Sequence, residues 1–131
     1  MPITVQWLDE KKEVVFYEFT DPWTLTDWHQ AVDKSNDMMS AVPHRVHTIA
    51  DMTGSSVIPS NILLGARYAS KKFSPNVGMI IYVRANQFIQ TVANMAQKLF
   101  PNLKSKVYFT ETFEAAIEMA QARIAADQVK S

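Results

Sequence analysis

The feature that most constrains the fold is an uninterrupted apolar run of strand length, Val77 to Val83, which follows the helix breakers Ser74-Pro75-Asn76. A run of this length without polar alternation is typical of a strand that is buried on both faces. A second run, Val46 to Met52, is mostly apolar, also reads as a buried strand and ends at the polar turn Thr53-Gly54-Ser55-Ser56. Because apolar residues recur at helical spacing around both runs, the pattern predicts strands that alternate with helices in a mainly parallel sheet.

The first part of the chain predicts a different arrangement. Ile3 to Trp7 alternates apolar and polar residues, and the apolar run Val14 to Phe19 follows the polar turn Asp9-Glu10-Lys11-Lys12. Two such runs joined by a short polar turn indicate an antiparallel β-hairpin with one face in water.

Helix start signals stand at several places between the strands. Thr24 with Asp27 three residues later resembles a capping box, a side-chain pair that satisfies free N–H groups at the start of a helix. Ser60 and Thr110 are further residues of an N-cap type, and a third helical stretch runs from about Asn86 to Leu99. The sequence therefore predicts four helices.

With a short strand from Lys106 to Thr110, the elements follow the order ββαβαβαβα. This order predicts one α/β domain over residues 1–131, with a mixed, mainly parallel sheet and an N-terminal antiparallel hairpin. The runs Val46 to Met52 and Val77 to Val83 are expected at the centre of the sheet because of their near-continuous apolar character.

The third helix has two contrasting sides. The apolar arc that we expect to face the core consists of Phe88, Ile89, Val92, Met95, Ala96 and Leu99. The opposite side holds Gln87, Gln90 and Asn94, without a charge before Lys98. Together with Leu64 and Tyr68, which we expect to point outward from the second helix, these polar residues are a candidate surface for self-association or a protein partner. An uncharged exposed face without a function is the alternative.

The composition bounds the function classes. The chain has no cysteine, which excludes thiolate catalysis and Cys-ligated metals and fits a cytoplasmic location. The N-terminus does not resemble a leader peptide and no run of eighteen apolar residues occurs, so secretion and a membrane span are not expected. His44 and His47 would lie on opposite faces of an extended segment and His29 belongs to a distant helix, so we expect neither a metal site nor a cofactor.

The charge is polarised although the net charge is zero. Residues 1–65 contain four Lys or Arg and nine Asp or Glu, and residues 66–131 contain nine and four. From Arg67 to Lys106 there are seven basic side chains and no acidic one. A solvated face and a site for an anion or an acidic partner both fit this pattern. We expect no nucleic-acid binding, because no recognition motif accompanies these charges.

In open α/β sheets, ligands tend to bind beyond the carboxyl ends of the parallel strands. The polar residues expected there form a candidate site for a ligand, an anion or a partner: Thr53, Ser55, Ser56, Ser60, Arg84 and Asn86. Helix N-termini and a nearby guanidinium would favour an anion or a phosphorylated side chain. Helix capping alone would produce the same polar residues.

Catalytic signals are weak, and we assign no catalytic residue. The chain contains neither the G-x-S-x-G nucleophile motif nor a glycine-rich phosphate loop, and Asp51 at a strand end has no evident paired acid. Asp51 would act as a general base only beside a basic or histidine partner, and the alternative is a carboxylate that caps a local turn.

The order of elements resembles the STAS superfamily, and more narrowly the SpoIIAA-like group of small bacterial proteins. The resemblance spans nearly the whole chain and rests on three segments: Trp23-Thr24 with Asp27, Thr48 to Met52, and Val107 to Thr110 running into Phe113-Glu114-Ala115-Ala116. It implies a non-enzymatic regulatory or protein-interaction module similar to anti-sigma-factor antagonists.

In phosphoregulated STAS proteins an Asp-Ser pair carries the modified serine, and the matching pair here is Pro59-Ser60. Ser60 is thus a candidate phosphorylation site with proline in place of the acidic neighbour, and helix capping is its alternative role. A carrier or sensor of a small anionic or amphipathic ligand is the alternative function, which a cavity under the second helix would favour. An enzyme that uses Asp51 or Ser60 is the third.

Overall fold

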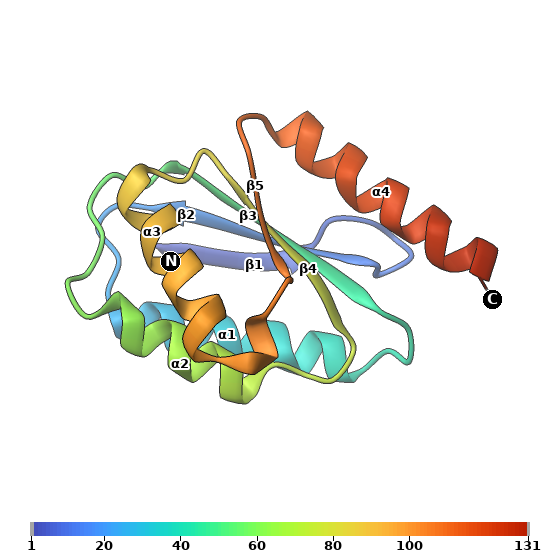
Figure 1. The fold of residues 1–131 in the computed structure, drawn as a ribbon, viewed down its shortest axis with the longest axis horizontal. Coiled ribbons are helices and arrows are strands. Elements are labelled where there is room, and N and C mark those ends of the chain that lie inside the picture. The colour runs from blue at the N-terminus through green and yellow to red at the C-terminus, as the bar shows by residue number, and fades with distance from the viewer. Residues whose placement is uncertain (1, 131) are drawn as a thin grey trace.

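The protein is a five-stranded sheet with helices on both faces (Figure 1). The computed structural model describes residues 2–130, with the side chain of Lys130 excepted. The elements, in chain order, are β1 (Ile3–Trp7), β2 (Val14–Thr20), α1 (Leu25–Ser40), β3 (Val46–Gly54), α2 (Ile62–Lys72), β4 (Val77–Val83), α3 (Gln87–Leu99), the 3-10 turn η1 (Pro101–Leu103), β5 (Val107–Thr110) and α4 (Phe113–Lys130). The predicted order ββαβαβαβα is confirmed.

The strands lie side by side in the order of the chain, β1-β2-β3-β4-β5. β1 is antiparallel to β2, whereas the pairs β2–β3, β3–β4 and β4–β5 are parallel. The mixed, mainly parallel sheet with an N-terminal hairpin is therefore confirmed, and β3 and β4 are inner strands as expected. In β1, Ile3 and Val5 are buried while Thr4 and Gln6 are exposed, so this hairpin strand has one face in water.

The sheet separates two cores. The larger core lies between the sheet and the helices α1, α2 and α3, and the smaller one lies under α4 (Figure 1). On β3, Ala50 and Met52 point to the first core and Ile49 points to the second, as the two-residue period of a strand requires. Because both faces of the inner strands are covered, β3 and β4 are buried over most of their length.

Two helix starts differ from the prediction. The capping box of Thr24 and Asp27 is present at α1, and Asn86 caps α3 by accepting the Ile89 N–H at 2.9 Å. However, α2 begins at Ile62 after Asn61, so Ser60 does not cap it. At α4 the cap is Thr112, whose hydroxyl oxygen accepts the Ala115 N–H at 3.1 Å.

Thr110 was the wrong cap for α4 because it is still part of the sheet. It pairs with Val83 as the last residue of β5, and it lies two residues before the position that caps a helix beginning at Phe113. The start of α4 therefore depends on where the pairing of β4 with β5 ends.

The apolar arc predicted for α3 is wider than the face that the helix buries. Ile89 and Ala96 are its fully buried residues. Phe88, Met95 and Leu99, which were expected to face the core, are 50%, 45% and 55% exposed. A helix that lies on a flat sheet buries only the stripe beneath it, so the edge of a broad arc remains in solvent.

The helices α1 and α2 approach closely at Gly65. A Cβ atom on Gly65 would lie 2.8 Å from Cδ1 of Trp28, so any side chain there would separate the helices. The Trp28 indole N–H donates to the Gly65 carbonyl at 2.8 Å across the same contact. The Trp28 ring is thereby held above the sheet. Among the described residues no helix is long and apolar enough to cross a bilayer.

Candidate functional site

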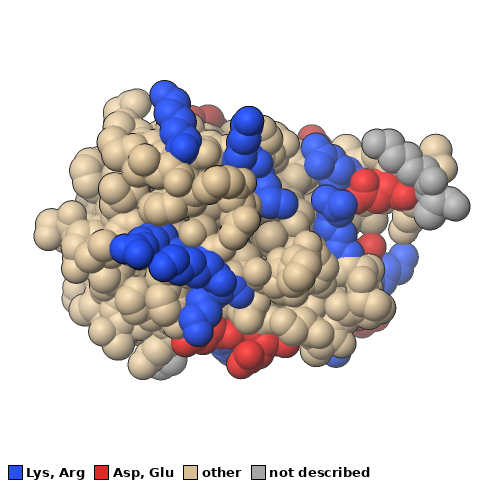
Figure 2. Space-filling view, turned by 60° about the horizontal axis from the view of Figure 1, so that its bottom comes forward, with Lys and Arg blue, Asp and Glu red and all other residues tan. Residues whose placement is uncertain are grey.

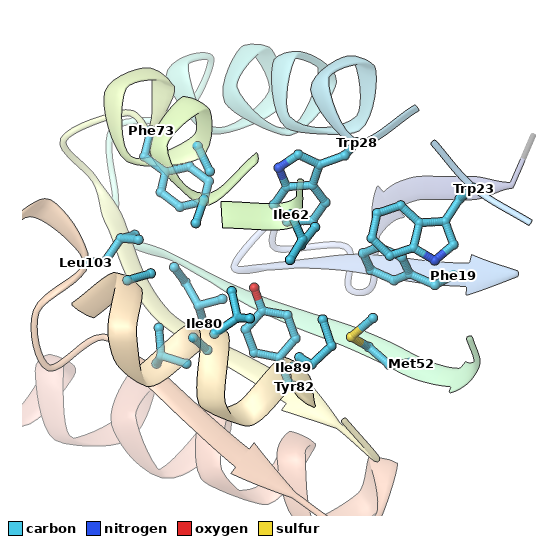
Figure 3. A pocket seen from close by; sticks show the side chains of 16 residues that line it. Phe19, Trp23, Trp28, Met52, Ile62, Phe73, Ile80, Tyr82, Ile89 and Leu103 are labelled. Carbon is cyan, nitrogen blue, oxygen red and sulfur yellow. The ribbon is translucent and has the colours of Figure 1, made fainter. Parts of the chain in front are cut away.

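A cavity lies in the larger core, between the sheet and the helices α2 and α3 (Figure 3). It encloses about 60 Å³ of free space. The lining side chains, all apolar or aromatic, are Phe19, Trp23, Trp28, Met52, Ile62, Ala66, Ala69, Phe73, Ile80, Tyr82, Ile89, Val92, Ala93, Ala96, Leu103 and Val107. The space is roughly that of four to six water-sized atoms, because one water needs about 10–15 Å³.

One end of the cavity is aromatic. The rings of Phe19 and Trp23 meet edge to face with centroids 5.1 Å apart, and Trp28 stacks on Phe19 at 5.9 Å. The indole N–H of Trp23 donates to the Ser55 hydroxyl at 2.8 Å, and that of Trp28 donates to a backbone carbonyl. Both polar handles are satisfied in the protein, so the cavity meets the carbon surfaces of these rings.

Tyr82 brings the one hydroxyl group of the lining. It comes from β4, its ring stacks on Phe109 with centroids 5.9 Å apart, and its oxygen points toward the middle of the cavity (Figure 3). Within the described part of the chain this hydroxyl has no hydrogen-bond partner, and burial raises the pKa of Tyr82 to about 12. The neutral hydroxyl is therefore available to a bound molecule, and an unmade hydrogen bond in an apolar site costs free energy.

The cavity exists because small residues line its helical side. Ala66 and Ala69 on α2 and Ala93 and Ala96 on α3 border it. Larger side chains at these positions would close the space, as they do in a densely packed core. Alanine at helical spacing predicts an inward face, but it does not reveal how far apart two helices lie. Sequence reasoning therefore missed the cavity residues as a site.

The polar rim predicted from the strand ends is largely used by local structure. The backbone N–H and the hydroxyl of Ser56 donate to Asp21 at 2.8 and 2.9 Å. These hydrogen bonds, the backbone one first, hold the pKa of Asp21 below its usual range. Ser55 is buried and accepts the Trp23 N–H. Thr53 donates its N–H and its hydroxyl to Asp51, at 2.9 and 2.6 Å, so Asp51 caps a local turn.

Two of the remaining rim residues, Arg84 and Asn86, also make local hydrogen bonds. Arg84 donates through Nε to the Glu111 carbonyl at 3.1 Å, and Asn86 caps α3. Ser60 is exposed in the connection before α2. Because the strands follow chain order without a reversal, the sheet has no switch point at which the strand ends open into a crevice. Ligand, anion or partner binding at this rim stays a prediction.

The predicted interface residues are divided by the structure. Leu64 is 55% exposed, and Gln87 and Asn94 are exposed on α3. Gln90 is half-buried and donates to the Ala85 carbonyl at 3.0 Å.

Tyr68, by contrast, does not point outward as expected. Its ring stacks on His29 with centroids 4.0 Å apart, and its hydroxyl donates to Asp33 at 2.6 Å, so it packs on α1. That hydrogen bond raises the pKa of Tyr68. Its position in the α2 sequence alone could not show which neighbouring helix it would meet.

Comparison of the chain with protein-family models, with characterised proteins and with solved structures found no match. The similarity to the STAS superfamily rests on the residue patterns alone and stays a prediction.

Proposed function

We propose that the protein is a carrier or sensor that binds a small molecule through an apolar end group in the cavity between the sheet, α2 and α3. The observation that carries this proposal is free space of about 60 Å³ with an entirely apolar and aromatic lining. Ligand sites are concave and mostly apolar, with a small number of placed polar groups. The cavity meets this description, and it lies under the second helix, where a ligand carrier was expected to have one.

The size and the single hydroxyl define the end group. It has about four to six non-hydrogen atoms, as a short alkyl chain or a single ring does. An oxygen acceptor in this group would receive a hydrogen bond from Tyr82, whose hydroxyl points into the cavity. A short ketone therefore fits better than an alkane of the same length.

The proposal is tested by titration with 2-pentanone and with n-pentane, followed through the indole N–H signals in NMR spectra. Trp23 and Trp28 line the cavity and Trp7 does not, so the third indole is an internal control. Both probes should shift the first two signals and leave that of Trp7 in place. Tyr82→Phe should weaken 2-pentanone binding about three- to tenfold, the worth of one neutral hydrogen bond, and leave n-pentane unaffected.

A cavity-filling variant completes this experiment. Ala93→Leu places a larger side chain at the half-buried wall of α3 and should abolish the binding of both probes while the protein stays folded. If the unmodified protein showed no indole shift at millimolar probe, or if Ala93→Leu bound both probes as well as the unmodified protein, the cavity would be a packing defect and no site.

A second function is favoured by the exposed apolar residues of α3. Phe88, Met95 and Leu99 are 45–55% exposed, and Leu64 of α2 is 55% exposed. Contiguous exposed apolar groups mark interaction surfaces, which supports a regulatory or protein-interaction module. Self-association through this face would give a concentration-dependent dimer in light scattering that Leu99→Gln abolishes and that Val129→Gln, at a residue 87% exposed on α4, preserves. A monomer at high micromolar concentration would contradict self-association.

The regulatory variant of this second function includes modification of Ser60. Ser60 is exposed and lies outside the helix, where a kinase would reach its hydroxyl. Mass spectrometry of the protein from its own host, before and after phosphatase, tests this. A mass difference of one phosphate that maps to Ser60 is the expected result, and an unmodified peptide under all growth conditions would argue against it.

A further inference from the structure

The apolar wall of the cavity continues onto the surface of the protein. Val92 lines the cavity from α3 and is half-buried. Phe88 stands four residues before Val92, Met95 three after it and Leu99 seven after it, so the four side chains form one row along the helix. Phe88, Met95 and Leu99 are about half exposed. A molecule whose end lies in the cavity would therefore find apolar surface outside it as well.

Basic side chains border this apolar row. Ala66 lines the cavity from α2, and the next residue, Arg67, is exposed. Lys71, one helical turn after Arg67, is exposed as well. On α3, Lys98 follows Met95 by three residues and is exposed. Figure 2 shows basic side chains in separate groups on one face of the molecule, with uncharged surface between them and acidic side chains below the lower group.

Among the described residues, these cations have no carboxylate within ion-pair distance. Within the described part of the chain, Arg45 pairs with Asp127 at 3.6 Å, whereas Arg67, Lys71 and Lys98 form no ion pair. The segment from Arg67 to Lys106 contains seven basic residues and no acidic one, so no acid from its own sequence neutralises them. A group of unpaired cations beside an exposed apolar surface attracts a negatively charged group.

We propose that the ligand is an anionic amphiphile. Its apolar end occupies the cavity, its chain lies against the row of Phe88, Val92 and Met95, and its carboxylate or other acidic head is held outside by Arg67 and Lys71. This inference rests on the proposed binding function of the cavity and adds the charge of the ligand to it. The head stays in solvent, which avoids the cost of burying a charge in an apolar site.

The test compares three probes with one chain length: octanoate, octanol and octylammonium, each below the concentration at which it aggregates. Calorimetry at 20 mM salt should give octanoate an affinity about three- to tenfold higher than octanol, and octylammonium the lowest affinity, as one or two exposed charge contacts allow. At 300 mM salt the preference should shrink, because the screening length falls from roughly 20 Å to roughly 6 Å.

Two double variants with the same change in net charge locate the head group. Arg67→Gln with Lys71→Gln should remove the preference for octanoate over octanol. Lys11→Gln with Lys34→Gln, in the hairpin turn and on α1, should retain it, since these exposed lysines lie on other elements. All four positions are exposed, so both variants should fold, which their melting curves report.

The outcomes separate this inference from the function on which it rests. Equal affinities for octanoate and octanol would overturn the anionic ligand and leave the cavity as a binding site, whereas binding of neither would contradict both. Loss of the preference in both double variants would also overturn the inference, because net charge and not α2 would then set it.

The source of the anion is distinguished by sedimentation with vesicles. Binding to phosphatidylglycerol vesicles and not to phosphatidylcholine vesicles would support an anionic lipid as the natural amphiphile. Octanoate binding without sedimentation in either case would support a free amphiphile in solution.

Discussion

His47 is a buried histidine that makes a hydrogen bond inside the sheet. It lies in β3 with 1% of its surface exposed, and its Nδ1 accepts the Met79 N–H at 2.9 Å. A side chain on Gly78 would have its Cβ atom 2.5 Å from that nitrogen, so the glycine makes room for the ring. Burial lowers the pKa of His47 to about 4, and Asp127 opposes the shift in part. The His47 ring is therefore neutral in the folded protein at neutral pH, and it accepts a hydrogen bond from β4.

This pKa makes the stability of the protein depend on pH. The folded pKa lies below the ordinary value near 6.5, so the unfolded chain binds the proton more tightly and stability falls as pH drops from about 6.5 toward 4. Because of His47, we expect the free energy of unfolding to fall by about 2 kcal/mol when the pH is lowered from 7 to 5. Urea denaturation at a series of pH values measures this loss.

His47→Gln should flatten this part of the pH dependence, and His44→Gln, at an exposed histidine, is the matched control for the loss of one imidazole. The slope is the readout, because the first variant also changes the core packing. An identical slope in His47→Gln and the unmodified protein would show that other groups cause it.

At the scale of elements, the start of α4 distinguishes the structure from the sequence pattern. Thr112 accepts the Ala115 N–H, whereas the Thr110 hydroxyl donates to the Thr112 carbonyl at 3.0 Å. An N-cap satisfies an otherwise free N–H group, and this function belongs to Thr112 alone of the two threonines.

Thr112→Ala should therefore lower the free energy of unfolding by about 1 kcal/mol, the usual worth of a cap. Thr110→Ala should cost less, because its hydroxyl donates to a carbonyl and satisfies no free N–H group of the helix. Thermal and urea unfolding of the pair compare them directly. A larger loss for Thr110→Ala than for Thr112→Ala would show that Thr110 is the N-cap of α4, as the sequence pattern indicates.

At the scale of the whole molecule, one helix protects one face of the sheet. The core under α4 brings together Val14, Ile49, Met79, Ile81 and Val83 with Ala116 and Ala120 of the helix. Three helices share the other face. The second core therefore depends on a close fit between α4 and the sheet, which the small alanines permit.

Ala120→Glu tests this dependence, since Ala120 is 1% exposed. A buried, unpaired carboxylate should cost about 3 kcal/mol or more, and α4 should detach from the sheet. Increased binding of a hydrophobic dye and loss of near-UV circular dichroism would report the exposed face. Ala122→Glu, at an exposed position of the same helix, is the matched control and should leave stability within about 0.5 kcal/mol.

Local sequence patterns were enough to predict the order and type of the elements. The apolar run of β4, the alternation in β1 and the capping box of Thr24 and Asp27 are local patterns, and each predicts its element from neighbours within a few residues. A chain that alternates strands with helices has few ways to cover both faces of its sheet, so the fold class followed as well.

The tertiary structure decided the site. The Trp28–Gly65 contact and the Trp23–Ser55 hydrogen bond join segments that are 37 and 32 residues apart, and they set the walls of the cavity. Whether Phe88 packs inward or stays in solvent, and whether Tyr68 meets α1, depends on how each helix is turned on the sheet. The spacing of apolar residues along one helix does not predict these contacts, because they form only when all the helices and strands pack together.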